Sequence, residues 1–252
     1  MKVGYARLYK DGTLVISKKW FTINPNIVKS YTIDSYGKKP WREECKLIKK
    51  VKIESFIRTN NIAFWFEDCI NLTTLIDFQK LDVSDCKDFS GVFWNCKSLI
   101  DIDSLQAWNV SNGKEFTSMF EYCKSLENIE ALRNWNVSSG INFSYMFFDC
   151  QSLKNLNGLV NWNVSHGIDF SYMFSYCTSF QDLNGLQTWN VSNGTDFSFM
   201  FAFCELLQNI LVSNTLSILN KDMFYKCNPR LKIHWKNHTY TYTDLLEYEE
   251  IC

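Results

Sequence analysis

The chain has 252 residues, of which 46% are hydrophobic and 16% aromatic, and its formal net charge is −1. This composition excludes an intrinsically disordered chain, because it supplies enough apolar surface for a packed core. It has no uncharged apolar run long enough to span a bilayer, and residues 1–7 lack the apolar region of a secretory signal. The sequence therefore predicts a soluble, cytoplasmic protein with no membrane partner.

The charge is distributed unevenly along the chain. Residues 1–60 hold 14 Lys+Arg and 5 Asp+Glu, a balance of +9, whereas residues 61–252 hold 12 and 22, a balance of −10. A basic head and an acidic body can steer oppositely charged partners, including other copies of the chain, although both can also be plain solvated surfaces. The basic residues of 38–58 alternate with Trp41 and Phe56, but no nucleic-acid-binding motif accompanies them.

The N-terminal segment predicts a β-rich cap over residues 1–58. Residues 5–9 and 14–17 flank an Asp11-Gly12 pair, which indicates a hairpin with a type I′ turn. A second strand pair is expected over 28–33 and 48–53, joined by a loop at 37–40. Such a cap is needed because the end of a solenoid exposes apolar surface and unpaired strand edges.

A fixed period then governs most of the chain. Cysteines fall at 69, 96, 123, 150, 177 and 204, always 27 residues apart, and a further Cys follows after 23 residues at 227. A period of this length indicates a solenoid of stacked units, each packing only on its neighbours. We expect the solenoid over residues 59–212, and the last short unit with a small C-terminal cap over 213–252.

Each unit has two predicted walls. In 151–177, the leucines and Val164 predict a short strand with adjoining turns. Phe170, Met173, Phe174 and Cys177 stand at 0, +3, +4 and +7, which predicts a short helix or 3₁₀ turn on the opposite wall. The fold class is thus an α+β repeat solenoid of leucine-rich-repeat type.

Other residues recur in the same phase and form columns. Trp108, Trp135, Trp162 and Trp189 form one column. A glycine column, at 113, 140, 167 and 194, is expected where φ is positive. Asp88, Glu115, Asn142, Asp169 and Asp196 are predicted to cap the short helix, in preference to binding calcium. The repeated Asn-Val-Ser triplets are predicted to form turns in preference to carrying glycans.

The cysteines of the column are predicted to be reduced and buried, because Cys packs as a small hydrophobe and stacking rarely gives disulfide geometry. Cys45, Cys86 and Cys252 lie outside the column, and the sequence does not pair them. At the C-terminus, residues 232–235 and 239–242 predict a hairpin around Asn237-His238, followed by a closing helix at 244–248.

These columns carry a family resemblance. The motif W-N-V-S, a spacer, and F-S-x-M-F-x-x-C-x-S-L recurs at 108–126, 135–153, 162–180 (with Phe180 for the final Leu) and 189–207, with small changes between the copies. The chain resembles the BspA-like leucine-rich repeat surface-protein family, with mycoplasma-lipoprotein-type repeats, over residues 40–227. The resemblance implies a leucine-rich-repeat-like solenoid, a role in protein binding or adhesion, and a cell-surface location as the alternative to the cytoplasm.

The sequence predicts no catalytic or metal site. Nucleotide-binding loops, nucleophile elbows and zinc-protease motifs are absent from the sequence, so no enzyme and no cofactor are expected. His166 occupies a turn position held by Asn or Ser in sister units. Cys227, His234 and His238 are a candidate zinc set because of the H-x₃-H spacing, but a structural role in the cap is expected.

The positions that vary between units carry the functional hypothesis. They flank the buried Met-Phe pair, so several should reach solvent, and their mixture of aromatic and small polar residues is typical of protein-binding surfaces. The predicted protein-binding residues are Tyr122, Tyr145, Phe148, Tyr172, Tyr176, Phe199 and Phe203. The alternative is that these rings only pack between neighbouring turns.

We therefore expect a non-enzymatic protein–protein interaction scaffold whose partner the sequence does not name. Three alternatives stay open: a surface adhesin or host-binding protein exported by an unrecognised route, a phage- or virus-encoded inhibitor of a host protein, and a self-assembling structural protein.

Overall fold

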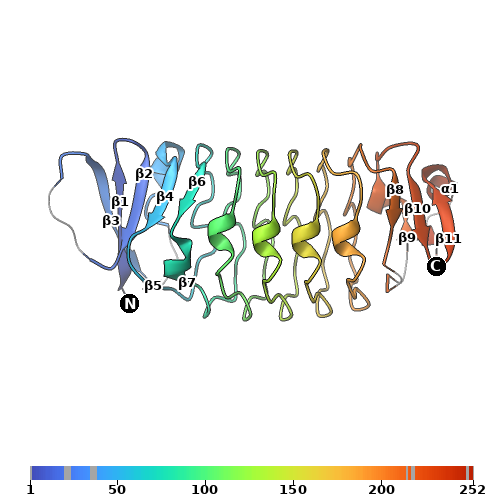
Figure 1. Ribbon diagram of the computed structural model, residues 1–252, viewed down its shortest axis with the longest axis horizontal. Coiled ribbons are helices and arrows are strands. Elements are labelled where there is room, and N and C mark those ends of the chain that lie inside the picture. The colour runs from blue at the N-terminus through green and yellow to red at the C-terminus, as the bar shows by residue number, and fades with distance from the viewer. Residues whose placement is uncertain are drawn as a thin grey trace.

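The computed structural model describes residues 2–19, 24–34, 39–213, 215–216, 219–247 and 250–251. Figure 1 shows an elongated molecule in which successive coils of the chain lie side by side, with the two termini at opposite ends. The strands are β1 (Lys2–Tyr9), β2 (Thr13–Ser17), β3 (Ile27–Asp34), β4 (Lys50–Ile53), β5 (Ile57–Arg58), β6 (Thr74–Ile76), β7 (Leu81–Asp82), β8 (Asn209–Leu211), β9 (Leu219–Asn220), β10 (Lys232–Trp235), β11 (His238–Thr241) and β12 (Glu250–Ile251). The helices are the 3₁₀ helices η1 (Arg42–Leu47), η2 (Phe78–Lys80), η3 (Asp103–Leu105), η4 (Glu130–Leu132), η5 (Asn157–Leu159), η6 (Asn184–Leu186) and η7 (Lys221–Phe224), and the α-helix α1 (Tyr242–Glu247).

A sheet of order β3-β1-β2-β4-β6 forms the N-terminal end. The predicted hairpin is present, because β1 and β2 pair antiparallel. Its turn type was predicted wrongly: Gly12 has φ +85°, but Asp11 is not left-handed, and Gly12 N–H donates to Tyr9 O. A single positive φ suits a three-residue loop better than a type I′ turn.

The second predicted strand pair is also corrected. Both segments are strands, but β3 pairs antiparallel with β1, whereas β4 pairs parallel with β2 and then with β6. The parallel order β2-β4-β6 lets the cap continue into the coils without a break, because equivalent segments of stacked coils run in the same direction and pair in parallel. Residues 35–38 of the expected loop lie outside the described part of the chain.

Hydrogen bonds join each coil to the next along the row that carries Phe, Met, Phe and Cys. Bridges connect residues 27 positions apart: 88 to 115, 115 to 142, 142 to 169, and 169 to 196. Within one coil, alternate N–H groups donate to carbonyls of the following coil. The pairs in one such step are Phe116 to Asn142, Ser118 to Ser144, Phe120 to Met146, and Tyr122 to Phe148. The intervening N–H groups close turns three residues back, as Met119 does to Phe116.

This row is neither the short helix nor the 3₁₀ turn that the spacing predicted. Every fourth residue has a positive φ, for example Ser118 and Tyr122 at 57° and 60°. A left-handed residue in each turn reverses the local winding, so the chain advances as a flat run of turns while 0, +3, +4 and +7 still point inward. We call this feature the turn ladder.

The wall predicted as a strand carries the 3₁₀ helix instead. In the unit 151–177, η5 covers Asn157–Leu159, and the equivalent segments form η3, η4 and η6. An Asn or Asp two residues before each helix accepts the N–H of its first residue, as Asn155 does from Asn157. These local bonds compete with a strand ladder, which explains the difference.

Columns of buried side chains hold the coils together. The thiols of the cysteine column are free and buried, as predicted. Cys45 and Cys86 are free and buried as well, and Cys252 lies outside the described residues. Each thiol from Cys96 to Cys227 donates to the carbonyl of the inward-facing Phe of the preceding coil. Each indole of the tryptophan column, from Trp108 to Trp189, donates to a carbonyl 30 residues earlier, as Trp135 Nε1 does to Leu105 O at 3.0 Å. A buried column thus satisfies backbone acceptors as well as filling space.

The glycine column has a different cause from the one predicted. None of Gly113, Gly140, Gly167 and Gly194 has a positive φ. A Cβ on Gly113 would instead lie 2.6 Å from Phe116 Cζ, and the same contact recurs in the sister units. Glycine is required here because the phenylalanine ring of the ladder lies against the backbone.

Donors and acceptors from the caps close the two ends of the ladder. Its carbonyls point toward the N-terminus, where Trp41 Nε1 donates to Trp65 O at 2.8 Å and Lys39 Nζ donates to Glu67 O at 2.7 Å. At the other end the N–H of Lys226 donates to the Tyr242 hydroxyl at 2.9 Å. The caps therefore satisfy backbone groups that a free solenoid end would leave open.

The C-terminal hairpin and helix are confirmed with small shifts. β10 and β11 pair antiparallel, and the two turn residues, Lys236 and Asn237, have φ of 47° and 65°. The closing helix α1 begins two residues earlier than predicted, at Tyr242. Its first turn is held by Asp244, whose carboxylate accepts from the N–H and hydroxyl of Thr241.

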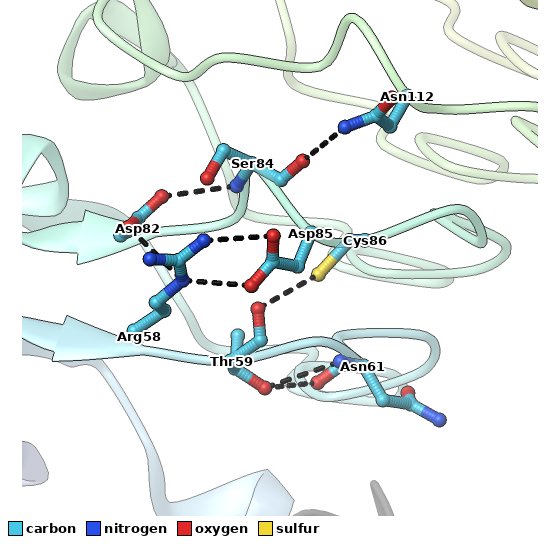
Figure 2. A network of polar contacts seen from close by, with 8 residues as sticks. All are labelled: Arg58, Thr59, Asn61, Asp82, Ser84, Asp85, Cys86 and Asn112. Atoms are coloured by element: carbon cyan, nitrogen blue, oxygen red, sulfur yellow. Dashed lines mark hydrogen bonds and ion pairs between the residues drawn. The ribbon is translucent and has the colours of Figure 1, made fainter.

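Figure 2 shows a polar network at the corner where the first coils meet. Arg58 donates to both carboxylate oxygens of Asp85, at 2.7 and 2.8 Å, across one coil step. Asn112 Nδ2 donates to Ser84 O one coil further on, and the Cys86 thiol donates to Thr59 O. His166 and Asn193 reach the equivalent carbonyls of Ser138 and Ser165, so this corner is a structural seam.

Candidate protein-binding surface

The seven predicted binding residues lie on the turn ladder and come together on one face. Tyr176 is 37% exposed and the other six are half-buried, whereas the Met of each of these coils and the Phe that follows it are buried. The rings that flank the Met-Phe pair therefore reach solvent, as the sequence predicts.

The rings form a continuous strip along the molecule. Tyr145 stacks on Tyr172 at 4.7 Å between centroids, and Tyr172 stacks on Phe199 at 5.0 Å. A parallel row holds Tyr176 stacked on Phe203 at 4.1 Å. Phe148 joins the rows, with rings on both sides at 5.5 Å. The rings therefore also pack between neighbouring turns, as the alternative interpretation expected, because they contact one another while keeping an exposed side.

Two further rings extend the strip beyond the predicted set. Trp94 contacts Tyr122 at its N-terminal end, and Tyr225 contacts Phe199 and Phe203 at its C-terminal end. Both stand two residues before a column cysteine, as Phe148 does. Tyr225 was missed because its unit is four residues short, but counting back from Cys227 would have found it. We call the following nine residues the aromatic strip: Trp94, Tyr122, Tyr145, Phe148, Tyr172, Tyr176, Phe199, Phe203 and Tyr225.

Six of these rings stand on left-handed backbone. Tyr122, Tyr145, Tyr172, Tyr176, Phe199 and Phe203 have φ between 57° and 62°. That conformation costs an L-residue roughly 1–2 kcal/mol, and only Gly, Asn and Asp adopt it readily. Gly91 and Asn95 occupy the same two columns in an earlier coil, so the ladder accepts the easier residues. Large rings at these positions are not what backbone stability alone would select.

Carboxylates stand inside the strip. Glu121 lies in the column of Trp94 and Phe148, and Asp149 in the column of Tyr122 and Tyr176. Asp149 is 7% exposed and pairs with Lys124 Nζ at 2.8 Å. Burial raises the pKa of Glu121, the side chains of Ser118 and Trp94 hydrogen-bond to it, and the charge of Asp149 raises its pKa further.

An acidic column borders the strip. Four of its five members accept the N–H two residues on: Asp88, Asn142, Asp169 and Asp196. The predicted capping role holds, but the capped element is the turn ladder and not a helix. Glu115 is the exception, and burial followed by the charge of Asp88 raises its pKa. The Asn of each Asn-Val-Ser triplet accepts the N–H of the Ser, which confirms the turn prediction.

The residues weighed as a zinc set do not converge. Cys227 donates to Phe201 O, His234 contacts Thr239 and Asn209, and His238 Nδ1 lies 2.9 Å from Lys236 O. Within the described ranges, no group of three or more His, Cys, Asp or Glu could hold a metal ion.

The chain belongs to the family described as "Mycoplasma protein of unknown function, DUF285", which it matches over residues 60–182 and 130–234. The match begins with the first coil and ends in the C-terminal cap, so it covers the whole ladder. This confirms the sequence-based identification of BspA-like, mycoplasma-lipoprotein-type repeats.

Solved structures with low similarity include two leucine-rich repeat proteins. A leucine-rich cell surface protein from Faecalibacterium prausnitzii is 15% identical, with 92% of this chain and 88% of that chain covered and a TM-score of 0.30. A leucine-rich repeat protein from Bacteroides ovatus is 14% identical, with 97% and 80% covered and a TM-score of 0.30. No curated protein matches the chain. In the described residues, no helix has the length and apolarity needed to cross a membrane.

Proposed function

We propose that this protein is a non-enzymatic scaffold that binds a protein partner through the aromatic strip. One observation carries the proposal: six half-exposed or exposed rings occupy left-handed positions where Gly or Asn would be less strained. Aromatic side chains supply large contact area with few rotatable bonds, so little entropy is lost when they dock. Their mutual stacking fixes the rings before a partner arrives.

The strip has the dimensions of a peptide-binding surface. It crosses the coils that end at Cys96, Cys123, Cys150, Cys177, Cys204 and Cys227. Five steps of about 4.8 Å between hydrogen-bonded coils give a length of ~24 Å. An extended segment of about seven residues spans that distance at ~3.3 Å per residue.

A comparative capture experiment tests the proposal. Wild-type protein, a strip variant (Tyr145→Gly, Tyr172→Gly and Phe199→Gly) and a matched control would be incubated with cell extract and compared by quantitative mass spectrometry. The control, Ile100→Ser with Ile168→Ser, removes exposed apolar side chains outside the strip. The proposal predicts a protein captured by wild type and control and lost in the folded strip variant; equal capture by all three would contradict it.

Self-assembly is the second candidate, favoured by the +9 and −10 charge balances of the two parts of the chain. Light scattering at low and high salt separates it from partner binding, because head-to-tail contacts between opposite charges weaken as salt rises. The cytoplasmic location remains part of the proposal, and fractionation of the source cells decides between it and the cell surface.

A further inference from the structure

We infer that the aromatic strip recognises a basic segment of its partner, with an arginine seated against Glu121 between Trp94 and Phe148. The inference rests on the proposed function and adds the chemistry of the partner. Three observations carry it: the absence of an ion pair to Glu121 among the described residues, the charge around the strip, and a cation already bound to the strip by the chain itself.

The first observation is the surroundings of Glu121. The structure records no ion pair for Glu121 in the described part of the chain, whereas the neighbouring Asp149 has Lys124 at 2.8 Å. Aromatic rings stand one coil away on each side of Glu121, at Trp94 and Phe148. A carboxylate partly withdrawn from water without a cation is unfavourable, and a cation supplied by a partner removes that penalty.

The second observation is the charge of the face. Between residues 134 and 220 the only Lys or Arg in the sequence is Lys154, which is paired with Glu127. Asp169 and Asp196 border the strip along the same stretch, next to the column of Tyr145, Tyr172 and Phe199. The field over the part of the strip from Tyr145 to Phe203 is therefore negative, and it favours a basic partner over nucleic acid or an anionic lipid surface.

The third observation is an internal example of the proposed contact. At the C-terminal end of the strip, Lys226 Nζ lies 5.5 Å from the Phe203 ring centroid and 5.4 Å from the Tyr225 centroid. The rings of the strip thus accept a cation from the chain itself. The end that holds Trp94, Glu121 and Tyr122 offers rings together with a carboxylate, and Lys124, the described cation whose charge acts on Tyr122, pairs with Asp149.

Arginine fits this end better than lysine. The guanidinium group is planar, stacks on aromatic rings, and can donate two parallel hydrogen bonds to one carboxylate. An ammonium group offers the same charge without the planar fork. The expected occupant is therefore an extended, arginine-containing segment, and a second copy presenting its basic residues 1–60 is the competing occupant.

The test uses full-length protein and three fluorescein-labelled peptides: Arg-Ala, Lys-Ala and Glu-Ala repeats of eight residues. Fluorescence anisotropy should give binding of the arginine peptide, weaker binding of the lysine peptide and none of the glutamate peptide. Glu121→Gln, which keeps the side-chain volume, should weaken arginine-peptide binding about tenfold, in line with the loss of one charged hydrogen-bonding partner. Glu247→Gln on α1 removes the same charge away from the strip and should leave affinity unchanged.

Several outcomes overturn the inference. If Glu121→Gln and Glu247→Gln weaken arginine-peptide binding equally, the effect comes from the net charge of the protein and not from Glu121. If Glu121→Gln binds the arginine peptide as tightly as wild type, the arginine does not bind at Glu121. A wild-type dimer in sedimentation velocity that Glu121→Gln dissociates would make a second copy the occupant. If the captured partner is lost in the strip variant but not in Glu121→Gln, the arginine inference fails and the proposed function stands. If neither variant loses it, both fail.

Discussion

At the left-handed positions of the turn ladder, a glycine variant should be more stable than an alanine variant, which is the reverse of the usual order. At Tyr172, φ is 57°, and the ring stacks on Tyr145 and Phe199 at 4.7 and 5.0 Å. Tyr172→Ala and Tyr172→Gly both remove these stacks, so that loss cancels when the two variants are compared. What remains is the backbone: alanine keeps the left-handed strain and glycine does not.

The magnitude follows from two opposing effects. Left-handed backbone costs alanine roughly 1–2 kcal/mol, while the greater freedom of unfolded glycine costs about 0.5–1 kcal/mol. We therefore predict that Tyr172→Gly is more stable than Tyr172→Ala by roughly 0.5–1 kcal/mol. Phe148 lies on the same strip without a positive φ, so it is the matched control. There the usual order should hold, with alanine more stable than glycine by about 0.5–1 kcal/mol.

Urea unfolding followed by circular dichroism measures all four variants against wild type. Midpoints and slopes are compared together, because long repeat arrays can lose two-state behaviour. The reasoning predicts a change of sign between the two positions. If glycine is the less stable variant at Tyr172 by as much as at Phe148, the left-handed backbone is not a source of strain, and the argument for function from it fails.

Three other predictions concern the frame that carries the strip. Burial raises the pKa of the Cys227 thiol to about 12, whereas an unfolded thiol ionises near ~8.5. The contribution of Cys227 to the free energy of unfolding should therefore be fully retained below about pH 8.5 and decline by up to ~1.4 kcal/mol per pH unit toward pH 12. The other buried thiols with raised pKa values add to the decline in wild type, so urea midpoints at pH 7, 8.5 and 10 should fall less steeply in Cys227→Ala. Trp41→Phe leaves the buried Trp65 carbonyl without its indole donor and should lower stability by about 1–3 kcal/mol; a loss below 0.5 kcal/mol, as a rough limit for an unimportant contact, would contradict the capping role. Arg58→Gln breaks the exposed pair with Asp85 and should cost no more than about 1 kcal/mol, less at high salt; a larger or salt-independent loss would show that the seam in Figure 2 depends on that pair.

The side-chain columns could be predicted from the sequence because the phase of a repeat survives any backbone conformation. Trp108, Cys123 and their counterparts face inward whether a coil is strand, helix or turn, so burial and free thiols followed directly. The same reasoning placed Tyr145 and Tyr176 beside the buried Met-Phe pair. Residues at equivalent positions of stacked coils must lie side by side, and that is enough to gather a surface from separate units.

The backbone could not be predicted in the same way. Phe116, Met119, Phe120 and Cys123 show helical spacing, but a run of turns with one left-handed residue in four buries the same positions. Nothing in a row such as Ser118, Tyr145 and Phe199 signals positive φ, because glycine and asparagine hold those columns in only a few coils. Gly113 shows the converse: a recurring glycine indicated positive φ, whereas a phenylalanine ring lying against its backbone is the cause.

The most direct test of partner binding through the strip is site-specific photo-crosslinking. Benzoylphenylalanine at Tyr176, which is 37% exposed on the strip, is compared with the same residue at Ile168, which is 45% exposed and outside it. After irradiation in cell extract, the account predicts a discrete protein adduct from position 176 that is absent from position 168. Adducts of equal yield and pattern from both positions, or an adduct from position 168 alone, would contradict the assignment of binding to the aromatic strip.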